Sequence, residues 1–478
     1  MNKSNTDKIF YSGLSFVFIA LCVIAFTTDG TGGGGDSIAH YFIARFSWSH
    51  PSLFLDHWGK PLFTSLGSLF AQFGFKAIKF FNIIVTILAC HFSFLIAKHF
   101  KLKNAAWIVV LYFFSPETIR VTLSGLTEPL FALVLIMGIY FMIKSKRLTG
   151  TIILSFLPFA RSEGLVILCL VFLYLLYIKE YKLLPWLIFG HLFMGVAGIF
   201  MYHDILWVFN KLPYARLDSV YGHGSWKHFI VQLFYIIGPV IYALLIVSFV
   251  GFGLNFRKDF WTKIKDQILI DKAFLFYGMF LIFFFAHTLF WTLGIFGSLG
   301  LTRVFVGIIP VIALLSLEGL NSVFDLLEKY QLNKFRMGFM VFIFVGLIFF
   351  CFVNKKTFVD YKHGFVLNED QKVIAHEVVP YIQQKYPTFK SYFSDIGFAY
   401  FFDIDVFGKE GSYQIRDIQN LNELNDKTLI IWDGWFSRVE ERITKDSLLH
   451  NPNLKLDTTF KAVLKNNDTI DYCIFLKR

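Results

Sequence analysis

The feature of this sequence that most constrains its fold is a series of apolar runs long enough to cross a lipid bilayer. The first run covers residues 9–28, and further runs recur as far as residue 353. A helix of roughly 20 apolar residues spans the ~30 Å hydrocarbon core of a membrane. Phenylalanine supplies 61 of the 478 residues, more than the core of a soluble domain needs. These runs predict a polytopic α-helical membrane protein.

The first run follows two lysines and resembles a secretory signal, but it is longer than the apolar part of a signal peptide. We therefore predict that it is retained as the first transmembrane helix. In total we predict about eleven spans, at residues 9–28, 77–97, 104–115, 126–143, 149–161, 163–178, 183–203, 229–253, 273–295, 303–320 and 336–353. The runs at 104–115 and 149–161 are short enough to be tilted or broken.

Lysine and arginine gather in alternate loops between the predicted spans. The basic loops are "KHFKLK" from Lys98, "KSKR" from Lys144, "KEYK" from Lys179, the segment from Arg257, and "EKYQLNKFR" ending at Arg336. Cytoplasmic loops carry this excess, so the pattern predicts a cytoplasmic N-terminus. The odd number of spans then places the C-terminal segment outside. The net charge of +11 reflects this topology, and no nucleic-acid partner is predicted.

From residue 354 onward the composition becomes that of an ordinary polar domain. Residues 369–387 have apolar residues at helical spacing, and residues 427–437 and 469–478 have the pattern of strands. We therefore predict two parts: a membrane domain at 1–353, with a first extracytoplasmic loop at 29–76, and a small extracytoplasmic α/β domain at 354–478.

Candidate site residues begin in the first outer loop. After the glycine run "GGGG", Asp36 and His40 are four residues apart and share one face of a helix, with Tyr41 beside them. Asp36 also suits the N-cap of an interfacial helix, and that structural role is the competing interpretation. Glycine is costly to order, so the run predicts a pliable loop before Asp36.

A second group, Asp56, His57 and Lys60, precedes Pro61 in the same loop. A lysine at the membrane surface can bind an anionic head group as a point charge. The competing interpretation is interfacial anchoring by Trp58 and a snorkelling Lys60.

Four more ionisable residues stand at the predicted outer ends of spans: Glu128, Arg161, Glu163 and Arg303. Charges at such positions are costly and are functional candidates when they face a cavity. Arg161 and Glu163 can equally form a structural pair. Arg303 has no acid nearby in sequence, which leaves a ligand phosphate or a distant carboxylate as its partner. The histidines lack a metal-binding spacing, so no metal site is predicted, although use of a divalent metal stays open.

In layout the chain resembles the GT-C superfamily of membrane glycosyltransferases, and is similar to protein O-mannosyltransferases and lipid A aminoarabinose transferases. The resemblance covers roughly residues 1–353 and is strongest over 29–164. It rests on the order of "GGDSIAHY", "HWGKPLF", "TEPLFA" and "ARSEGL" along the chain. Asp36 matches the family's catalytic aspartate, Ser37 stands where a second acid is usual, and Lys60-Pro61 resembles the Lys-Pro near the lipid phosphate.

The resemblance implies a sugar donor carried on a polyprenyl phosphate, with no further cofactor. Asp36 would be the general base that takes a proton from the acceptor hydroxyl, and the sugar would invert at its anomeric carbon. Lys60, Arg161 or Arg303 would stabilise the leaving phosphate. The remaining candidates would bind substrate, and the acceptor would be a lipid, a glycan or a protein. A bacterial inner membrane is the expected location.

Three other functions remain open from sequence. A flippase or other polytopic transporter would show internal repeats and charges at the bilayer midplane. A membrane sensor would need a cytoplasmic signalling domain, and the basic loops are too short to form one. An O-antigen-type polymerase or ligase would carry a larger late outer loop than residues 204–228.

Overall fold

The computed structural model describes residues 3–32, 34–213, 221–257, 266–353, 365–408, 414–415, 418, 424–464 and 467–478. The helices up to residue 177 are α1 (Lys3–Thr27), α2 (Gly34–Phe46), α3 (Pro61–Ala71), α4 (Phe75–His99), α5 (Ile108–Phe113), α6 (Pro116–Thr122), α7 (Glu128–Ile143), α8 (Arg147–Ser155), α9 (Leu157–Ala160) and α10 (Gly164–Tyr177). They are followed by α11 (Phe189–Tyr202), α12 (Trp207–Asn210), α13 (His228–Ile237), α14 (Pro239–Arg257), α16 (Gln267–Lys272), α17 (Met279–Leu293), α18 (Ile309–Lys329) and α19 (Arg336–Ile348).

Among the described residues, six helical segments are long and apolar enough to cross a membrane. They are Asn5–Thr27, Phe75–His99, Tyr181–Tyr202, Gln267–Leu293, Thr302–Lys329 and Asn333–Phe352. The chain is thus a polytopic helical protein of the membrane-embedded type. The predicted runs at 126–143, 149–161 and 163–178 form shorter apolar helices, and the run at 104–115 yields only a short turn and α5.

The predicted span at 229–253 is not one straight helix. It is divided into α13 and α14, which meet at 116°. Gly238 at the junction has φ 79°, a conformation that glycine adopts without steric cost. Pro239 follows it and lacks the amide hydrogen that would continue the helix. The pair forms either a broken span or a re-entrant segment, and with it the number of candidate spans rises to seven.

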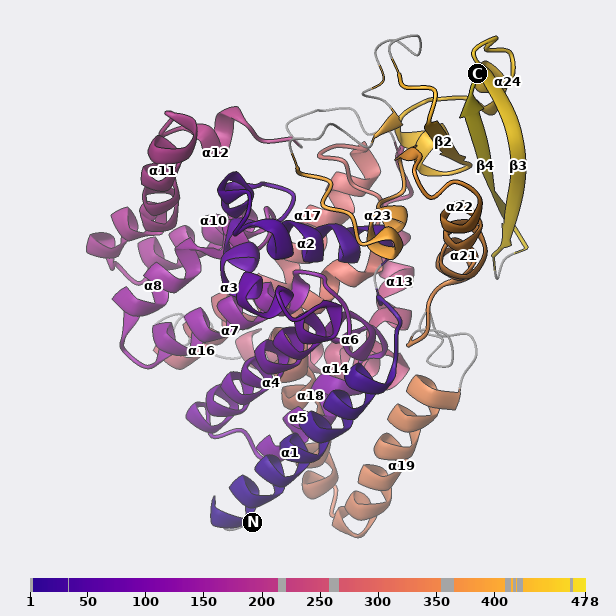
Figure 1. The fold of residues 1–478 in the computed structure, drawn as a ribbon. Coiled ribbons are helices and arrows are strands. Elements are labelled where there is room, and N and C mark those ends of the chain that lie inside the picture. Colours follow the sequence, from indigo (N-terminus) through magenta and orange to yellow (C-terminus); the bar gives the residue numbers. More distant parts are fainter. Residues whose placement is uncertain are drawn as a thin grey trace.

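The core of the membrane domain lies around α4, α7 and α18. Nearly every residue of α7 and of the first four turns of α18 is buried, so both helices are enclosed by others. The peripheral helices α1 and α19 instead expose most of their apolar surface, as expected for helices that face lipid. The N-terminus lies at the opposite end of the molecule from the C-terminal strands (Figure 1).

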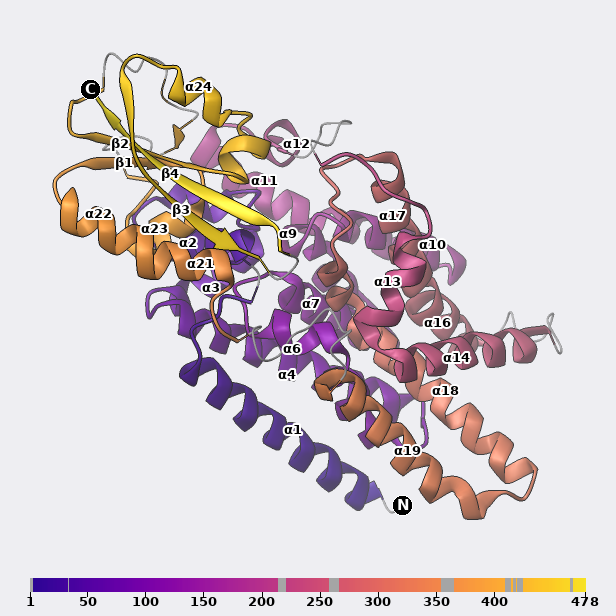
Figure 2. The ribbon, with the colours of Figure 1, turned by 90° about the vertical axis from the view of Figure 1, so that its right-hand side faces the viewer.

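The C-terminal domain contains a four-stranded sheet in the order β1-β2-β4-β3. Its strands are β1 (Lys390–Phe393), β2 (Thr428–Asp433), β3 (Leu454–Val463) and β4 (Thr469–Lys477), and its helices include α21 (Glu369–Val373), α22 (Val379–Lys385), α23 (Ile396–Phe402) and α24 (Lys445–Leu449). Strand β1 pairs parallel with β2, and the other two pairings are antiparallel. Helices α21 to α23 lie between the sheet and the membrane domain (Figure 2). The predicted α/β character, the helix near 369–387 and both strands are confirmed.

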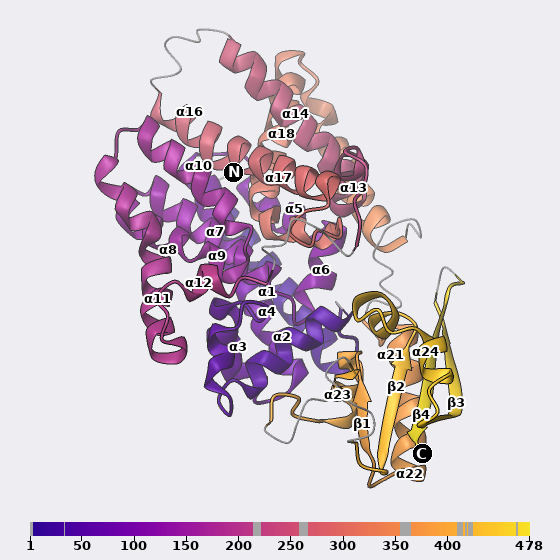
Figure 3. The same ribbon diagram turned by 90° about the horizontal axis from the view of Figure 1, so that it is seen from above.

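This domain contacts the predicted first outer loop, residues 29–76, at several points. Thr31 and Gln371 exchange side-chain hydrogen bonds, and His50 lies 2.8 Å from the carboxylate of Asp405. Seen from above, the domain lies beside α2 and α6 rather than over α11 and α12 (Figure 3). The predicted domain boundary at residue 354 lies outside the described residues.

Candidate functional site

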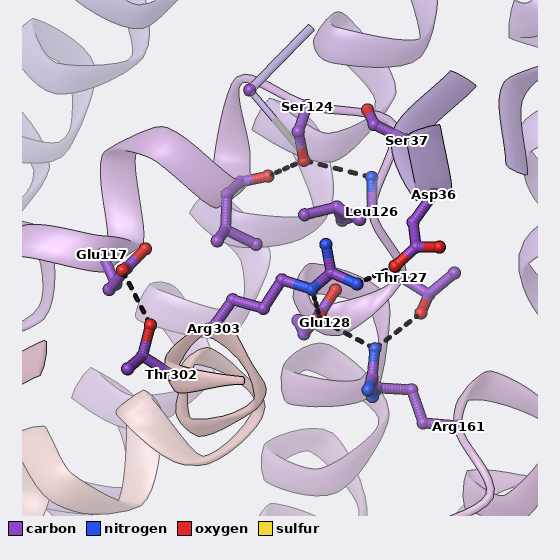
Figure 4. A network of polar contacts seen from close by, with 12 residues as sticks. Asp36, Ser37, Glu117, Ser124, Leu126, Thr127, Glu128, Arg161, Thr302 and Arg303 are labelled. Carbon is purple, nitrogen blue, oxygen red and sulfur yellow. Dashed lines mark hydrogen bonds and ion pairs between the residues drawn. The ribbon is translucent and has the colours of Figure 1, made fainter. Parts of the chain in front are cut away.

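A connected group of charged side chains lies between α2, α7 and the start of α18 (Figure 4). Arg303, from the short helix η5 (Thr302–Ile308), forms an ion pair with Asp36 of α2. Its Nε also lies 3.4 Å from Oε1 of Glu128, the first residue of α7. Arg303 therefore has two distant carboxylates as partners, one of the two alternatives that its sequence context left open.

Glu128 joins this pair to a second arginine. Nη1 of Arg161 lies 2.8 Å from the same Oε1 of Glu128 and donates to the Thr127 hydroxyl. Nη2 of Arg161 lies 2.8 Å from Glu163. Arg161 and Glu163 are thus paired, as one interpretation expected, but the pair belongs to a larger group.

Lys60 reaches the same region from the first outer loop. Its Nζ donates to the Ser162 hydroxyl at 3.3 Å, between Arg161 and Glu163 in the chain. Lys60 has φ 60° and precedes Pro61, the first residue of α3. Proline suits the first position of a helix, because an amide hydrogen at that position would have no partner within the helix and its loss costs nothing. The turn directs a buried lysine side chain toward α10 instead of toward solvent.

We call these six residues the charged network: Asp36, Lys60, Glu128, Arg161, Glu163 and Arg303. It contains three acids and three bases, so its formal charges cancel. Glu128 is fully buried, whereas the Asp36 side chain keeps 32% of its surface exposed. Burying charges is costly unless they are paired, and a balanced set limits that cost. Asp36 is the acid of the network most accessible to a substrate.

The start of α2 holds Asp36 in place. Ser37, the next residue, accepts a hydrogen bond from the Gly125 amide at 2.6 Å and donates to the Thr31 carbonyl. A side chain at Gly125 would lie 2.4 Å from the Ser37 carbonyl oxygen, so this contact requires glycine. Asp36 lies in the first turn of α2, where the helix dipole favours a negative charge.

The electrostatics of the outer-loop residues follow from burial and this pairing. Burial alone would raise the pKa of Asp36, but Arg303 and His40 outweigh it and lower the pKa. Burial lowers the pKa of His40 to about 3, so His40 is a neutral imidazole at physiological pH. Burial also lowers the pKa of Lys60 to about 8, which leaves it mostly cationic at neutral pH.

Four predicted site residues lie outside the network. One of them, His40, is buried beside the Phe63 ring. Tyr41 packs edge-on against Phe75, because a residue five positions after Asp36 faces another side of α2. Asp56 accepts the Gly59 amide hydrogen at 2.7 Å and stabilises a turn. The His57 ring lies against Trp207, with 4.8 Å between ring centroids.

Sequence reasoning missed Thr127, Ser162 and His287, which contact the network. Nε2 of His287 lies 3.9 Å from the Glu163 carboxylate. A buried histidine within the apolar segment "FFFAHTLFW" was the available signal, because ionisable residues inside spans are rare. Thr127 and Ser162 offered no comparable signal, since both are ordinary residues of membrane helices and loops.

Close packing accounts for glycines of the first outer loop. A Cβ atom at Gly30 would lie 2.5 Å from the carbonyl carbon of Phe365. A Cβ at Gly32 would lie 2.9 Å from the Arg120 carbonyl oxygen, and Gly32 has φ 67°. Neither position accepts a larger residue without a backbone shift.

Gly35, at the start of α2, is also closely packed. A Cβ there would lie 3.1 Å from the ring of Phe436 in the C-terminal domain. Gly33 lies outside the described residues. The glycines thus allow other segments to approach Asp36 closely, a role that the sequence alone did not indicate.

The structure also contains an apolar groove of about 800 Å³. It lies between α10, α11 and α12, and its lining includes Leu165, Phe172, His191, Leu192 and Phe209. Leu165 is two residues beyond Glu163, and the His191 ring contacts Phe159, two residues before Arg161. The charged network and the apolar groove therefore use neighbouring residues of the chain, before and after the start of α10.

Within the described part of the chain, no three His, Cys, Asp or Glu side chains are arranged to hold a metal ion. Neither a family model, nor a curated protein, nor a solved structure matches this sequence. The resemblance to GT-C enzymes therefore rests on the sequence motifs alone.

Proposed function

We propose that the protein is a membrane glycosyltransferase that moves a sugar from a polyprenyl phosphate to an acceptor on the extracytoplasmic face. One observation carries the proposal. Lys60 and Arg161 lie at the start of α10, and the following turns of α10 line an apolar groove. A polyprenyl phosphate has the same order of parts, an anionic head joined to a long apolar chain. The cations would bind the phosphate head, and the apolar groove would hold the polyprenyl chain.

Asp36 is the proposed general base. Its Oδ2 faces Arg303, and its Oδ1 accepts no hydrogen bond from a described residue. That oxygen is available to an acceptor hydroxyl. As the hydroxyl oxygen forms its bond to the anomeric carbon, its proton passes to Asp36, and the bond from that carbon to the phosphate oxygen breaks. One displacement of this kind inverts the anomeric carbon.

The leaving group is a lipid phosphate, which gains negative charge in the transition state. Lys60, Arg161 and Arg303 are the cations that would stabilise this charge. Carboxylates hold Arg161 and Arg303 in place, and the Ser162 hydroxyl accepts a hydrogen bond from Lys60, so the three cations are already oriented. The donor bond breaks without a further cofactor, and a lipid, a glycan or a protein would serve as acceptor.

The proposal includes a topology. The shorter apolar helices α7, α8–α9 and α10 would count as spans together with the longer ones, in an arrangement like that of GT-C enzymes with about eleven spans. The N-terminus would be cytoplasmic, and the C-terminal domain would lie outside a bacterial inner membrane. Helix α2, which carries Asp36, lies next to the C-terminal domain and away from the N-terminus (Figure 1), and this agrees with a site on the same side of the membrane as that domain.

The test is release of polyprenyl phosphate from lipid-linked sugars by the purified protein, with membrane extract as the source of acceptors. We expect Asp36→Asn to lower the rate by at least 100-fold while the protein stays folded. The matched control is Asp29→Asn, which alters an exposed acid of the same loop that pairs with Lys76. It should retain the wild-type rate.

Equal release by wild type and Asp36→Asn would assign the base to another residue. If no donor tried yields polyprenyl phosphate, and lipid-linked sugar crosses the bilayer of reconstituted vesicles, the protein is a flippase. The break between α13 and α14 favours this second candidate, because transporters often contain discontinuous helices.

A further inference from the structure

The C-terminal domain contains a cavity of about 370 Å³ that the proposed transfer reaction does not use. Three aspartates face it from different elements: Asp370 from α21, Asp395 before α23 and Asp433 at the end of β2. The remaining lining residues are Trp435, Phe436, Leu464, Ile470 and Tyr472. No lysine, arginine or histidine is among the described residues that line the cavity.

The three carboxylates differ in how fully their oxygens are bonded. Asp433 accepts hydrogen bonds from the amides of Trp435 and Phe436 and from the Ser437 hydroxyl, so it is held in a turn. Asp395 uses Oδ1 to cap α23 through the Gly397 amide at 2.8 Å. Its Oδ2 accepts no hydrogen bond from a described residue, although the side chain is 95% buried.

Tyr472 is another polar residue that lines the cavity. The residue is 1% exposed, and its hydroxyl makes no hydrogen bond within the described chain. It lies opposite Asp433 in the pairing of β2 with β4. Burial and the charges of Asp395, Asp370 and Asp433 raise the pKa of Tyr472, so its hydroxyl lies in the field of all three acids. A buried hydroxyl normally has a partner, and a bound ligand would supply one here.

The acids also repel one another. Burial and the nearby charge of Asp433 raise the pKa of Asp395 well above its ordinary value. Burial raises the pKa of Asp433 and of Asp370 as well. A bound cation would remove this repulsion and would favour the ionised carboxylates.

The geometry distinguishes between kinds of cation. No metal-binding arrangement of three acidic, His or Cys side chains occurs in the described residues, and a cavity of about 370 Å³ is far larger than a bare ion. The walls contributed by Trp435, Phe436 and Tyr472 are aromatic. Carboxylates together with aromatic faces are the usual surroundings of an organic ammonium group.

We propose that this cavity binds a small organic molecule through a primary ammonium group, with Asp395 as the principal counter-ion and Tyr472 as a hydrogen-bond acceptor. The proposal concerns binding and stands without the transferase activity. The ligand would lie near the first outer loop, because the Phe436 ring that lines the cavity also contacts Gly35, the residue before Asp36.

The test compares amines with neutral molecules of the same shape. Saturation-transfer NMR on the full-length protein in nanodiscs would measure binding of ethanolamine and glucosamine, and of ethylene glycol and glucose. We expect at least one amine to bind at least tenfold more tightly than its neutral counterpart, because only the amine forms a charge-assisted bond. Asp395→Asn, which keeps the helix cap, should weaken the binding of that amine by about tenfold or more. Tyr472→Phe should weaken it roughly threefold.

Asp446→Asn provides the matched control, because Asp446 is an exposed acid of α24 in the same domain. It should leave amine binding unchanged. Three outcomes would each overturn the proposal. They are equal binding of glucose and glucosamine, absence of binding by both amines, and amine binding that survives Asp395→Asn. Competition of Ca²⁺ or Mg²⁺ against the amines at equal concentration would instead assign the cavity to metal ions.

Discussion

Glu128 is the acid of the network that pairs with both arginines. Its carboxylate contacts Arg161 and Arg303, and it has no exposed surface. Asp36 and Glu163 each pair with only one of these arginines. A buried charge that loses its partner keeps its full desolvation cost, so the middle acid matters most for stability.

Glu128→Gln should therefore destabilise the protein by roughly 3 kcal/mol, because two buried guanidinium groups lose a shared counter-ion. Reversible unfolding in mixed micelles would measure the change. Glu328→Gln serves as the control, since Glu328 is an exposed acid near Lys103 and its loss should leave the unfolding free energy unchanged. A Glu128→Gln variant as stable as wild type would show that Asp36 and Glu163 suffice to balance the arginines.

At the scale of elements, the glycine-rich segment before α2 joins three parts of the chain. Gly30 contacts the segment that enters the C-terminal domain, Gly32 contacts the turn between α6 and α7, and Gly35 contacts Phe436. The Gly30 amide also donates to the Phe365 carbonyl at 2.8 Å. The packing of this segment therefore sets the distance between Asp36 and these neighbouring parts of the chain.

Gly30→Ala should loosen this junction, because the new Cβ would meet backbone atoms, which cannot rotate away. We expect amide hydrogen exchange over residues 365–378 to become at least tenfold faster, as measured by mass spectrometry. Gly338→Ala on α19 is the control, since a Cβ there has no neighbour within 4 Å. Unchanged exchange in Gly30→Ala would mean that the junction adjusts without loss of contact.

At the scale of the whole molecule, aromatic packing holds the C-terminal domain against the membrane domain. The Tyr400 ring of α23 contacts Tyr41, Phe42 and Phe75, with centroids 5.8 to 6.3 Å apart. The ion pair between Arg45 and Asp403 lies beside this cluster and is more exposed. The aromatic cluster is therefore the stronger part of the contact.

Tyr400→Ala should weaken docking by roughly 2 kcal/mol, through the loss of three aromatic contacts. The Gly30 amide, whose hydrogen bond to Phe365 crosses the interface, should then exchange about 30-fold faster. Tyr386→Ala, which removes a ring that packs only within the C-terminal domain on Tyr381 and Phe389, should leave that amide protected. Loss of protection in both variants would indicate unfolding of the domain rather than undocking.

Much of the fold and of the charged network could be predicted from the sequence. Several features depend only on residues close together in the chain, so they are local properties that a sequence reveals. They are the apolar runs, the change of composition after residue 353, and the helix and strand patterns near residues 369–387, 427–437 and 469–478. The ionisable residues at the ends of spans were recognisable because such charges are costly there.

Only the tertiary structure decided which of these residues meet. The pairing of Asp36 with Arg303 joins positions 267 residues apart, and no local pattern specifies it. The packing of α2 against α23 gave Tyr41 its partner Tyr400, and the close approach of Phe365 and Phe436 explained glycines that a sequence reader attributes to flexibility. Helix formation depends on near neighbours, whereas ion pairs, close contacts and cavities depend on how distant segments pack, and that information is spread over the whole chain.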